Sequence, residues 1–171
     1  MAHFQIGSKP PASYDDPAGM LVHCHRRIEG NLDSLPRILD ALAACDPEAK
    51  PALGEVLRYF DRAGVRHTED EEFSVFPRIA GDATRALIDT LHAEHQEHEV
   101  IYLAFRTVAL KLLEAPDPER IPELRDHAKA LSGAYRDHIA REEKDLIPAI
   151  QALPEVELRA IGLEMRLRRG G

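Results

Sequence analysis

The chain has 171 residues, enough for one domain of ordinary size. It carries 22 basic and 30 acidic residues, a net charge of −8, which argues against a nucleic-acid-binding protein because such proteins need a basic face. Apolar residues make up 44% of the chain and charged residues 30%, as in folded globular proteins. No segment approaches the roughly 18 apolar residues of a membrane span, and residues 1–19 lack an apolar run of signal-peptide length. We therefore expect a cytoplasmic protein with no membrane contact.

Helical periodicity is strong along the chain, whereas strand signals are weak. Residues 1–16 include two adjacent prolines and are expected to form an N-terminal arm without regular structure. The first helix is expected to begin at Pro17, where a missing N–H costs nothing, with Asp16 as its N-cap. We expect this helix to end near Cys45, with a possible kink at Pro36.

Three further long helices and one short helix are predicted after the first. Asp46 and Asp82 are the expected N-caps of the second and third helices. The predicted helices cover approximately residues 47–77, 83–115, 119–151 and 154–169. Four long helices with short connections predict an all-α fold, an up-down-up-down antiparallel four-helix bundle. We expect the bundle to span residues 17–151 and a short C-terminal helix and tail to span 152–171.

Two segments of the chain share an unusual pattern. Residues 67–79 read HTEDEEFSVFPRI and residues 138–150 read HIAREEKDLIPAI. Each begins with His and has Glu at the fourth and fifth positions after it, Pro at the tenth and Ile at the twelfth. Helix formation alone does not require this match, so the repeat indicates a shared chemical role.

Four histidines have a glutamate four residues later in the sequence. A separation of four residues turns a helix by about 400°, so both side chains lie within about 40° of the same face. We expect these pairs to point into the interior of the bundle. The pairs are His25 and Glu29, His67 and Glu71, His95 and Glu99, and His138 and Glu142.

Buried imidazoles and carboxylates need partners, because each group buried without one costs roughly several kcal/mol of folding free energy. Metal ions remove that cost: neutral imidazole and carboxylate bind iron, manganese and zinc, and a carboxylate can bridge two ions. Six to eight such ligands are too many for one tetrahedral zinc ion and suit a pair of ions. Because no thiolate belongs to the set, iron is favoured, with manganese or zinc as alternatives.

These motifs resemble the hemerythrin-like, or HHE, cation-binding family, over roughly residues 17–151. The resemblance implies a four-helix bundle that holds two iron ions in a non-haem di-iron centre. It also implies that Glu71 and Glu142 are bridging carboxylates. The metal ligands implied by the resemblance are His25, His67, Glu71, His95, His138 and Glu142.

The sequence departs from the oxygen-carrying hemerythrins in two places. Those proteins have two histidines four residues apart on the third helix, whereas here Leu91 precedes His95 and Glu99 follows it. Their fourth-helix acid lies five residues after the histidine, whereas Glu142 lies four after. Glu99 and Glu29 are weaker candidate ligands, with hydrogen bonding to a ligand histidine as the alternative. Ferritin-like proteins have Glu-x-x-His motifs instead and fit less well.

Several other polar residues near the motifs are expected to lie outside the centre. Glu72 and Glu143 point about 100° away from the neighbouring glutamates, which favours a solvated or helix-contact role. His92 and His98 flank His95, and surface exposure is the favoured interpretation, with a fifth nitrogen ligand as the alternative. Surface positions are also expected for His3, His23 and His127.

The sequence favours a protein that binds or senses O2 or a related small molecule at the di-iron centre. One alternative is a di-iron enzyme that acts on peroxide, nitric oxide or O2, which the missing fifth histidine favours. Another is a protein for iron handling or for repair of iron centres. A helical bundle without metal is the remaining alternative.

Overall fold

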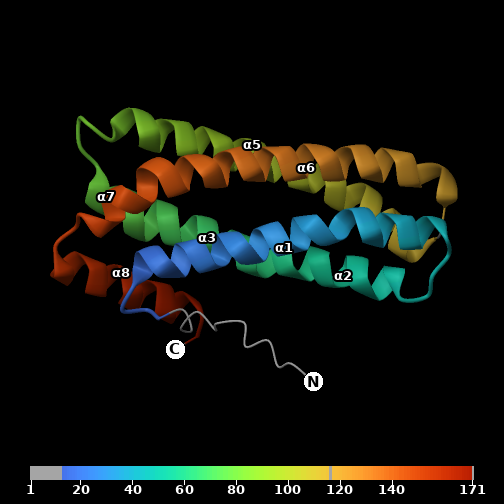
Figure 1. Cartoon of the computed structure of the whole chain (residues 1–171), viewed down its shortest axis with the longest axis horizontal. Helices are drawn as coiled ribbons and strands as arrows, with labels where there is room; N and C mark the ends of the chain where they lie inside the picture. The colour runs from blue at the N-terminus through green and yellow to red at the C-terminus, as the bar shows by residue number, and fades with distance from the viewer. Residues whose placement is uncertain (1–12, 116, 171) are drawn as a thin grey trace, which may run out of the picture.

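The computed structural model describes residues 13–115 and 117–170, and most of the predicted arm at 1–16 lies outside them. The predicted all-α bundle is confirmed: four helical rods lie side by side, and the described residues contain no strand (Figure 1). No helix within these ranges has the length and apolar character of a membrane span. The elements are α1 (Pro17–Ala43), α2 (Ala49–Tyr59), η1 (Phe60–Gly64), α3 (Val65–Asp70), η2 (Glu71–Val75), α4 (Phe76–Ile79), α5 (Arg85–Glu114), η3 (Pro118–Arg120), α6 (Ile121–Arg141), η4 (Glu142–Leu146), α7 (Ile147–Gln151) and α8 (Glu155–Arg168).

The first rod is α1, and its predicted start is confirmed. The Asp16 carboxylate accepts a hydrogen bond from the backbone N–H of Gly19 at 2.8 Å, and Pro17 is the first helical residue. The predicted N-caps of the next two rods are wrong, because turns occupy the residues that follow them. The second rod begins only at Ala49 and the third only at Arg85.

The second and fourth rods run without interruption but are not α-helical throughout. The second rod contains the π-helical turns η1 and η2, and the fourth contains η4. The turns η2 and η4 begin at Glu71 and Glu142 and are followed by Pro77 and Pro148. A proline has no N–H and its ring crowds the preceding turn, so a wider turn lets the rod continue through it. Each copy of the sequence repeat therefore contains one π turn, η2 or η4, whereas η1 lies before the first copy.

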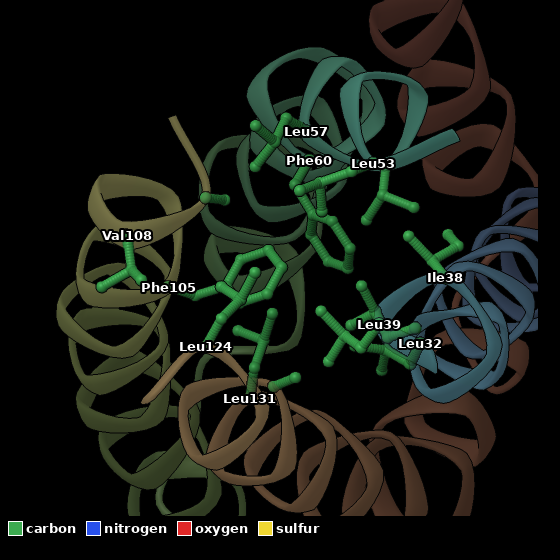
Figure 2. Packing of buried hydrophobic residues seen from close by; sticks show 14 of the residues in the cluster. Leu32, Ile38, Leu39, Leu53, Leu57, Phe60, Phe105, Val108, Leu124 and Leu131 are labelled. Carbon is green, nitrogen blue, oxygen red and sulfur yellow. The ribbon is translucent and has the colours of Figure 1, made fainter. Parts of the chain in front are cut away.

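Two apolar clusters fill the bundle. The larger cluster joins α1, α2, α5 and α6, and its side chains interdigitate between the rods (Figure 2). It includes Leu32, Leu53, Phe60, Phe105 and Leu131. The smaller cluster lies towards α7 and α8 and includes Leu21, Val75, Leu91, Leu146 and Ile161.

Along each rod, the polar motif residues fall between the residues of the two clusters. In α1, for example, His25 separates Leu21 of the smaller cluster from Ile28 of the larger one. The bundle thus holds a polar layer between two apolar ones. Burial of imidazoles and carboxylates in such a layer is unfavourable unless they have partners.

Candidate metal centre

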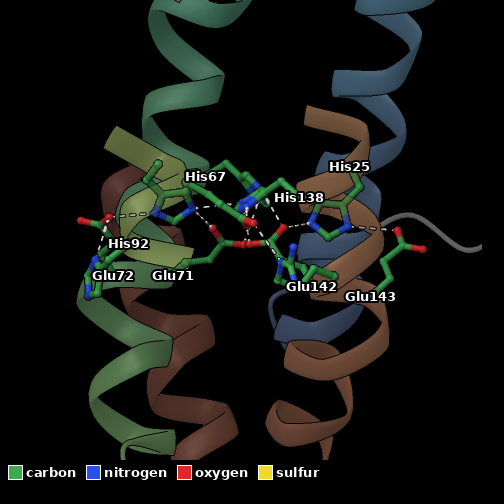
Figure 3. A network of polar contacts seen from close by, with 11 residues as sticks. His25, His67, Glu71, Glu72, His92, His138, Glu142 and Glu143 are labelled. Atoms are coloured by element: carbon green, nitrogen blue, oxygen red, sulfur yellow. Dashed lines mark hydrogen bonds and ion pairs between the residues drawn. The ribbon is translucent and has the colours of Figure 1, made fainter. Parts of the chain in front are cut away.

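The polar layer is built from all four rods, and Figure 3 shows its side chains converging from opposite directions. Each of the six main predicted ligands is at most 8% exposed. α1 contributes one, α3 and η2 two, α5 one, and α6 and η4 two. In that order they are His25, His67, Glu71, His95, His138 and Glu142.

The first group of possible metal ligands joins the first rod to the second and fourth. It consists of His25, His67, Glu71 and Glu142, whose ligand atoms all lie within 4.8 Å of one another. His25 Nε2 is 3.0 Å from Glu142 Oε2, and His67 Nε2 is 3.4 Å from Glu71 Oε1.

The second group joins the second, third and fourth rods. It consists of Glu71, His95, His138 and Glu142, again within 4.8 Å. His95 Nε2 is 3.2 Å from Glu71 Oε2, and His138 Nε2 is 3.0 Å from Glu142 Oε1. The two histidine Nε2 atoms of this group are 3.2 Å apart.

Both groups share the same two carboxylates, and each carboxylate faces each group with a different oxygen. Oε1 of Glu71 faces the first group and Oε2 the second, whereas Glu142 does the reverse. Two ligands that bind one ion at about 2.1 Å and at right angles lie about 3.0 Å apart. The observed separations of 3.0–3.4 Å across these four contacts are close to that value, so the arrangement fits two ions bridged by Glu71 and Glu142.

The buried polar atoms of this layer lack the partners that a protein interior requires. Seven of them have no suitably aligned hydrogen bond to any residue that the structure describes, although several lie at hydrogen-bonding distance. Unpaired buried groups of this kind need an explanation, such as an ion. They are His25 Nε2, both ring nitrogens of His67, and both carboxylate oxygens of Glu71 and Glu142.

Burial also shifts the proton equilibria of the layer. Burial lowers the pKa of His67 to about 3, so its ring is neutral, as metal binding requires. Burial and the neighbouring Glu142 raise the pKa of Glu71 well above its usual value. Burial acts in the same direction on Glu142, but polar contacts with His138 and His25 outweigh it and lower that pKa. The protein alone thus favours a single ionised carboxylate in the pair, whereas cations would stabilise two.

Carboxylates on neighbouring rods orient three of the four histidines. Glu143 contacts His25 Nδ1 at 3.0 Å (Figure 3). Glu72 contacts His95 Nδ1 at 2.8 Å, and Glu94 contacts His138 Nδ1 at 2.7 Å. An ionised carboxylate only accepts hydrogen bonds, so each Nδ1 carries the proton. In a neutral ring held in this way, Nε2 would present its lone pair to the centre of the layer, as a metal ligand does.

His67 differs from the other three histidines. Its Nδ1 is buried and has no hydrogen-bond partner among the described residues. Its ring meets that of His25 edge to face, with centroids 5.0 Å apart. No carboxylate therefore fixes the tautomer of this ring.

The structure does not bring the two weaker candidate ligands into either group. Glu29 is half-buried and pairs with Arg26, one turn earlier on the same helix. Glu99 is exposed on α5. Both follow their histidines by four residues, as Glu71 and Glu142 do, so it is the rotation of α1 and α5 within the bundle that turns them away from the centre.

Glu72 and Glu143, expected to be solvated or to contact another helix, take the second of these roles, because they hydrogen-bond histidines of the layer from other rods. The surface position expected for His98 is wrong. His98 is buried rather than exposed, and its ring stacks on Tyr135 with centroids 4.4 Å apart. The sequence did not predict the role of Glu94, because its partner His138 belongs to another rod and no pattern within α5 indicates the contact.

The C-terminal helix α8 and the residue after it contact the first repeat on the side facing away from the polar layer's centre. Asp70, fully buried and next to Glu71, pairs with Arg168 at 2.6 Å and Arg169 at 2.5 Å. Arg168 also donates to Ser74 Oγ at 2.6 Å, within the π turn η2. These contacts fix the segment that carries Glu71.

A cleft of about 410 Å³ extends from the surface to the polar layer. Residues of η1, α3, η2 and α5 line it, and Tyr135 of α6 does so as well. Among the six clustered residues, only His95 lines the cleft. The cleft therefore approaches the second group of ligands and not the first.

Comparison with known proteins agrees with this architecture. The family model described as Hemerythrin HHE cation binding domain matches residues 16–150. The chain is also 26% identical over 163 residues to an uncharacterised protein of Haemophilus influenzae, with 92% of each chain covered. The match to the family model spans most of the four rods and both sequence repeats, and the buried His and Glu cluster fits a metal-binding protein. The chain belongs to the hemerythrin HHE cation-binding domain family.

Proposed function

We propose that the polar layer holds a non-haem di-iron centre and that the protein binds or senses O2 or a related small molecule there. The observation that carries the proposal is the pair of four-residue groups that share Glu71 and Glu142. One ion in each group would give the partnerless carboxylate oxygens a role. The ligands would be His25 and His67 for the first ion, His95 and His138 for the second, and both glutamates for both ions.

The donor set supports iron over zinc, with manganese as the remaining alternative. Every donor is an imidazole nitrogen or a carboxylate oxygen, which suits iron, manganese and zinc. Three protein donors and one open position are typical of catalytic zinc, whereas here four residues surround each position and the carboxylates are shared. A shared carboxylate pair suits two ions of higher coordination number, and iron when bound would supply the affinity for O2.

The protein's own residues provide a dry and ordered site. The apolar clusters on both sides exclude water from the layer, and the outer carboxylates fix three imidazoles in the ligand tautomer. The cleft gives a small molecule a route to this otherwise buried layer.

A second candidate function is enzymatic, with peroxide, nitric oxide or O2 as substrate. The half-buried Tyr135, which lines the cleft beside His98, favours this alternative because a phenol can donate a proton or a hydrogen bond. Burial raises the pKa of Tyr135 well above its usual value, so the group stays protonated.

The two functions are distinguished by exposure of the iron-loaded, reduced protein to O2 and, separately, to peroxide. A binding or sensing protein forms a reversible O2 adduct with a stable absorption spectrum over repeated cycles. Turnover of peroxide, or irreversible oxidation with substrate consumption, supports the enzyme instead. Transfer of iron to an acceptor chelate or apoprotein, without either reaction, supports a role in iron handling.

A further inference from the structure

The cleft beside the polar layer lies between the second and third rods. Its outer part is lined by Val65, Thr68 and Phe73 from one side and by Gln96 and Glu99 from the other. Phe73 is 64% exposed and Val65 is 52% exposed, so the mouth is open to solvent. The inner end is formed by aromatic rings and histidines: Phe60, His95, His98, Tyr102 and Tyr135.

The inner end of the cleft contacts only one half of the candidate centre. His95 belongs to the second group, and His98 packs against His138 of the same group with ring centroids 4.7 Å apart. The histidines of the first group, His25 and His67, do not line the cleft. A molecule that enters here meets the second group first.

The charged side chains that line the cleft are acidic. Glu69, Glu72 and Glu99 line it, and no lysine or arginine is among the lining residues that the structure describes. Like charges repel an approaching ion, and salt screens that repulsion. The rest of the lining is mainly apolar or aromatic, which suits a small uncharged molecule.

We propose that exogenous ligands reach the centre through this cleft, at the His95 and His138 side, and that its carboxylates admit neutral molecules and retard anions. The ligand class is therefore a small neutral molecule of the size of O2, nitric oxide or hydrogen peroxide. The proposal rests on the proposed function, because it needs metal ions in the polar layer.

The route is tested first by obstruction, in iron-loaded protein with nitric oxide as the probe. Thr68→Trp places an indole in the cleft, and we expect the association rate of nitric oxide to fall at least about tenfold. Gln96→Trp obstructs the same cleft from α5 and serves as the second variant if the first does not fold. Thr107→Trp, at an exposed position of α5 that does not line the cleft, is the matched control and keeps the wild-type rate. Wild-type rates in both cleft variants overturn the proposed route.

Selection by charge is tested with azide, an anion of similar size, on the oxidised iron-loaded protein. We expect the azide association rate to rise with ionic strength in the wild type, because salt screens the repulsion. The double variant Glu69→Gln and Glu99→Gln should bind azide several-fold faster at low salt and lose most of the salt dependence. Its nitric oxide rate should stay within about twofold of the wild-type rate. Glu97→Gln, exposed on α5 but outside the cleft, is the control.

The failure of this proposal is distinguishable from failure of the proposed function. Iron content is measured before each kinetic experiment. A wild-type protein that takes up no iron contradicts the proposed function itself. A protein that binds two iron ions but shows an azide rate unchanged, or lowered, by salt contradicts only the selection of neutral ligands.

Discussion

The two sequence repeats, residues 67–79 and 138–150, place the same ligand motif in different surroundings. Both carry a histidine, a glutamate four residues later and a π-helical turn that begins at that glutamate. At the third position after the histidine, the first repeat has the fully buried Asp70, held by Arg168 at the end of α8 and by Arg169, which directly follows it. The second repeat has Arg141 there, 42% exposed and paired with Glu94.

The difference continues along the two repeats. Arg78 of the first repeat bonds Glu164 at 2.7 Å and Glu157 at 2.9 Å, both on α8, whereas the equivalent residue of the second repeat is Ala149. α8 itself packs closely against the chain before α1: a Cβ on Gly162 would lie 1.8 Å from the Tyr14 carbonyl oxygen. The motif alone thus sets the ligand types, but the first repeat depends on a helix outside the four rods for its position.

The largest expected effect comes from the carboxylates that the two repeats share between the groups. Glu142→Gln should lower bound iron from two ions per chain to less than one, because one oxygen of this residue faces each group. Glu71→Gln should lower the bound iron by the same amount if the two repeats contribute equally to the two groups of ligands. Metal analysis after reconstitution measures both. Glu29→Gln is the matched control, since Glu29 pairs with Arg26 outside the groups and should leave two ions bound.

The next largest effect is on the free energy of unfolding, and it compares the ion pairs that hold the two repeats in place. Asp70→Ala leaves Arg168 and Arg169 without their buried partner and should lower the free energy of unfolding by about 3 kcal/mol. Arg141→Ala, at the same position of the second repeat, removes an exposed pair and should cost less than about 1 kcal/mol. Urea titration of the metal-free variants gives both values. Equal losses would show that α8 does not support the first repeat specifically.

The fifth residue after the histidine of each repeat gives a prediction in which each repeat affects a different ion. Glu72 orients His95 of the second group, and Glu143 orients His25 of the first. Glu72→Gln should therefore lower the metal affinity of the second group, and Glu143→Gln should lower that of the first group. Each loss should be roughly tenfold to a hundredfold. Stepwise iron titration with a competing chelator separates the two ions. A loss of affinity for the same ion in both variants would contradict the assignment of these carboxylates.

The smallest expected effect concerns acid stability near the second repeat. Burial, with neighbouring His138 and His95, lowers the pKa of His98 to about 4. Below pH 6.5 the unfolded chain takes up this proton and the folded chain does not, so stability falls as the pH falls from about 6.5 towards 4. His98→Phe should reduce the stability lost between pH 7.5 and pH 4.5 by about 2 kcal/mol in the metal-free protein.

Urea titration at the two pH values measures this difference. His23→Phe, at an exposed position of α1, is the control and should leave the pH dependence as in the wild type. An unchanged pH dependence in His98→Phe would mean that the buried ring accepts a proton as readily as an exposed one.

The fold and the centre of the polar layer follow from patterns within single helices. The i, i+4 spacing sets which side chains share a face, and this is a property of one rod, so the sequence predicts the convergence of His25, His67, His95 and His138. The start of α1 was equally predictable, since Asp16 and Pro17 act within one turn. The resemblance to the HHE family added the choice of Glu71 and Glu142.

What the sequence does not reveal depends on contacts between rods. Glu72, Glu94 and Glu143 find their histidines on other rods, and nothing in their own helices indicates which residue they will meet. His98 is buried because Tyr135 of α6 lies against it. Glu29 and Glu99 have the same spacing as true members of the layer, and only the rotation of each rod within the bundle separates the two cases.

The central claim is that the polar layer holds a pair of metal ions, and metal analysis of the purified wild-type protein tests it most directly. The protein is reconstituted with ferrous iron under anaerobic conditions, freed of loosely bound metal, and its iron is measured against chain concentration. Two iron ions per chain are expected, retained at pH 7.5 and released as the pH is lowered, because protons then compete with the metal for the histidine and carboxylate ligands. A chain that retains no transition metal, or only one ion, would contradict the central claim.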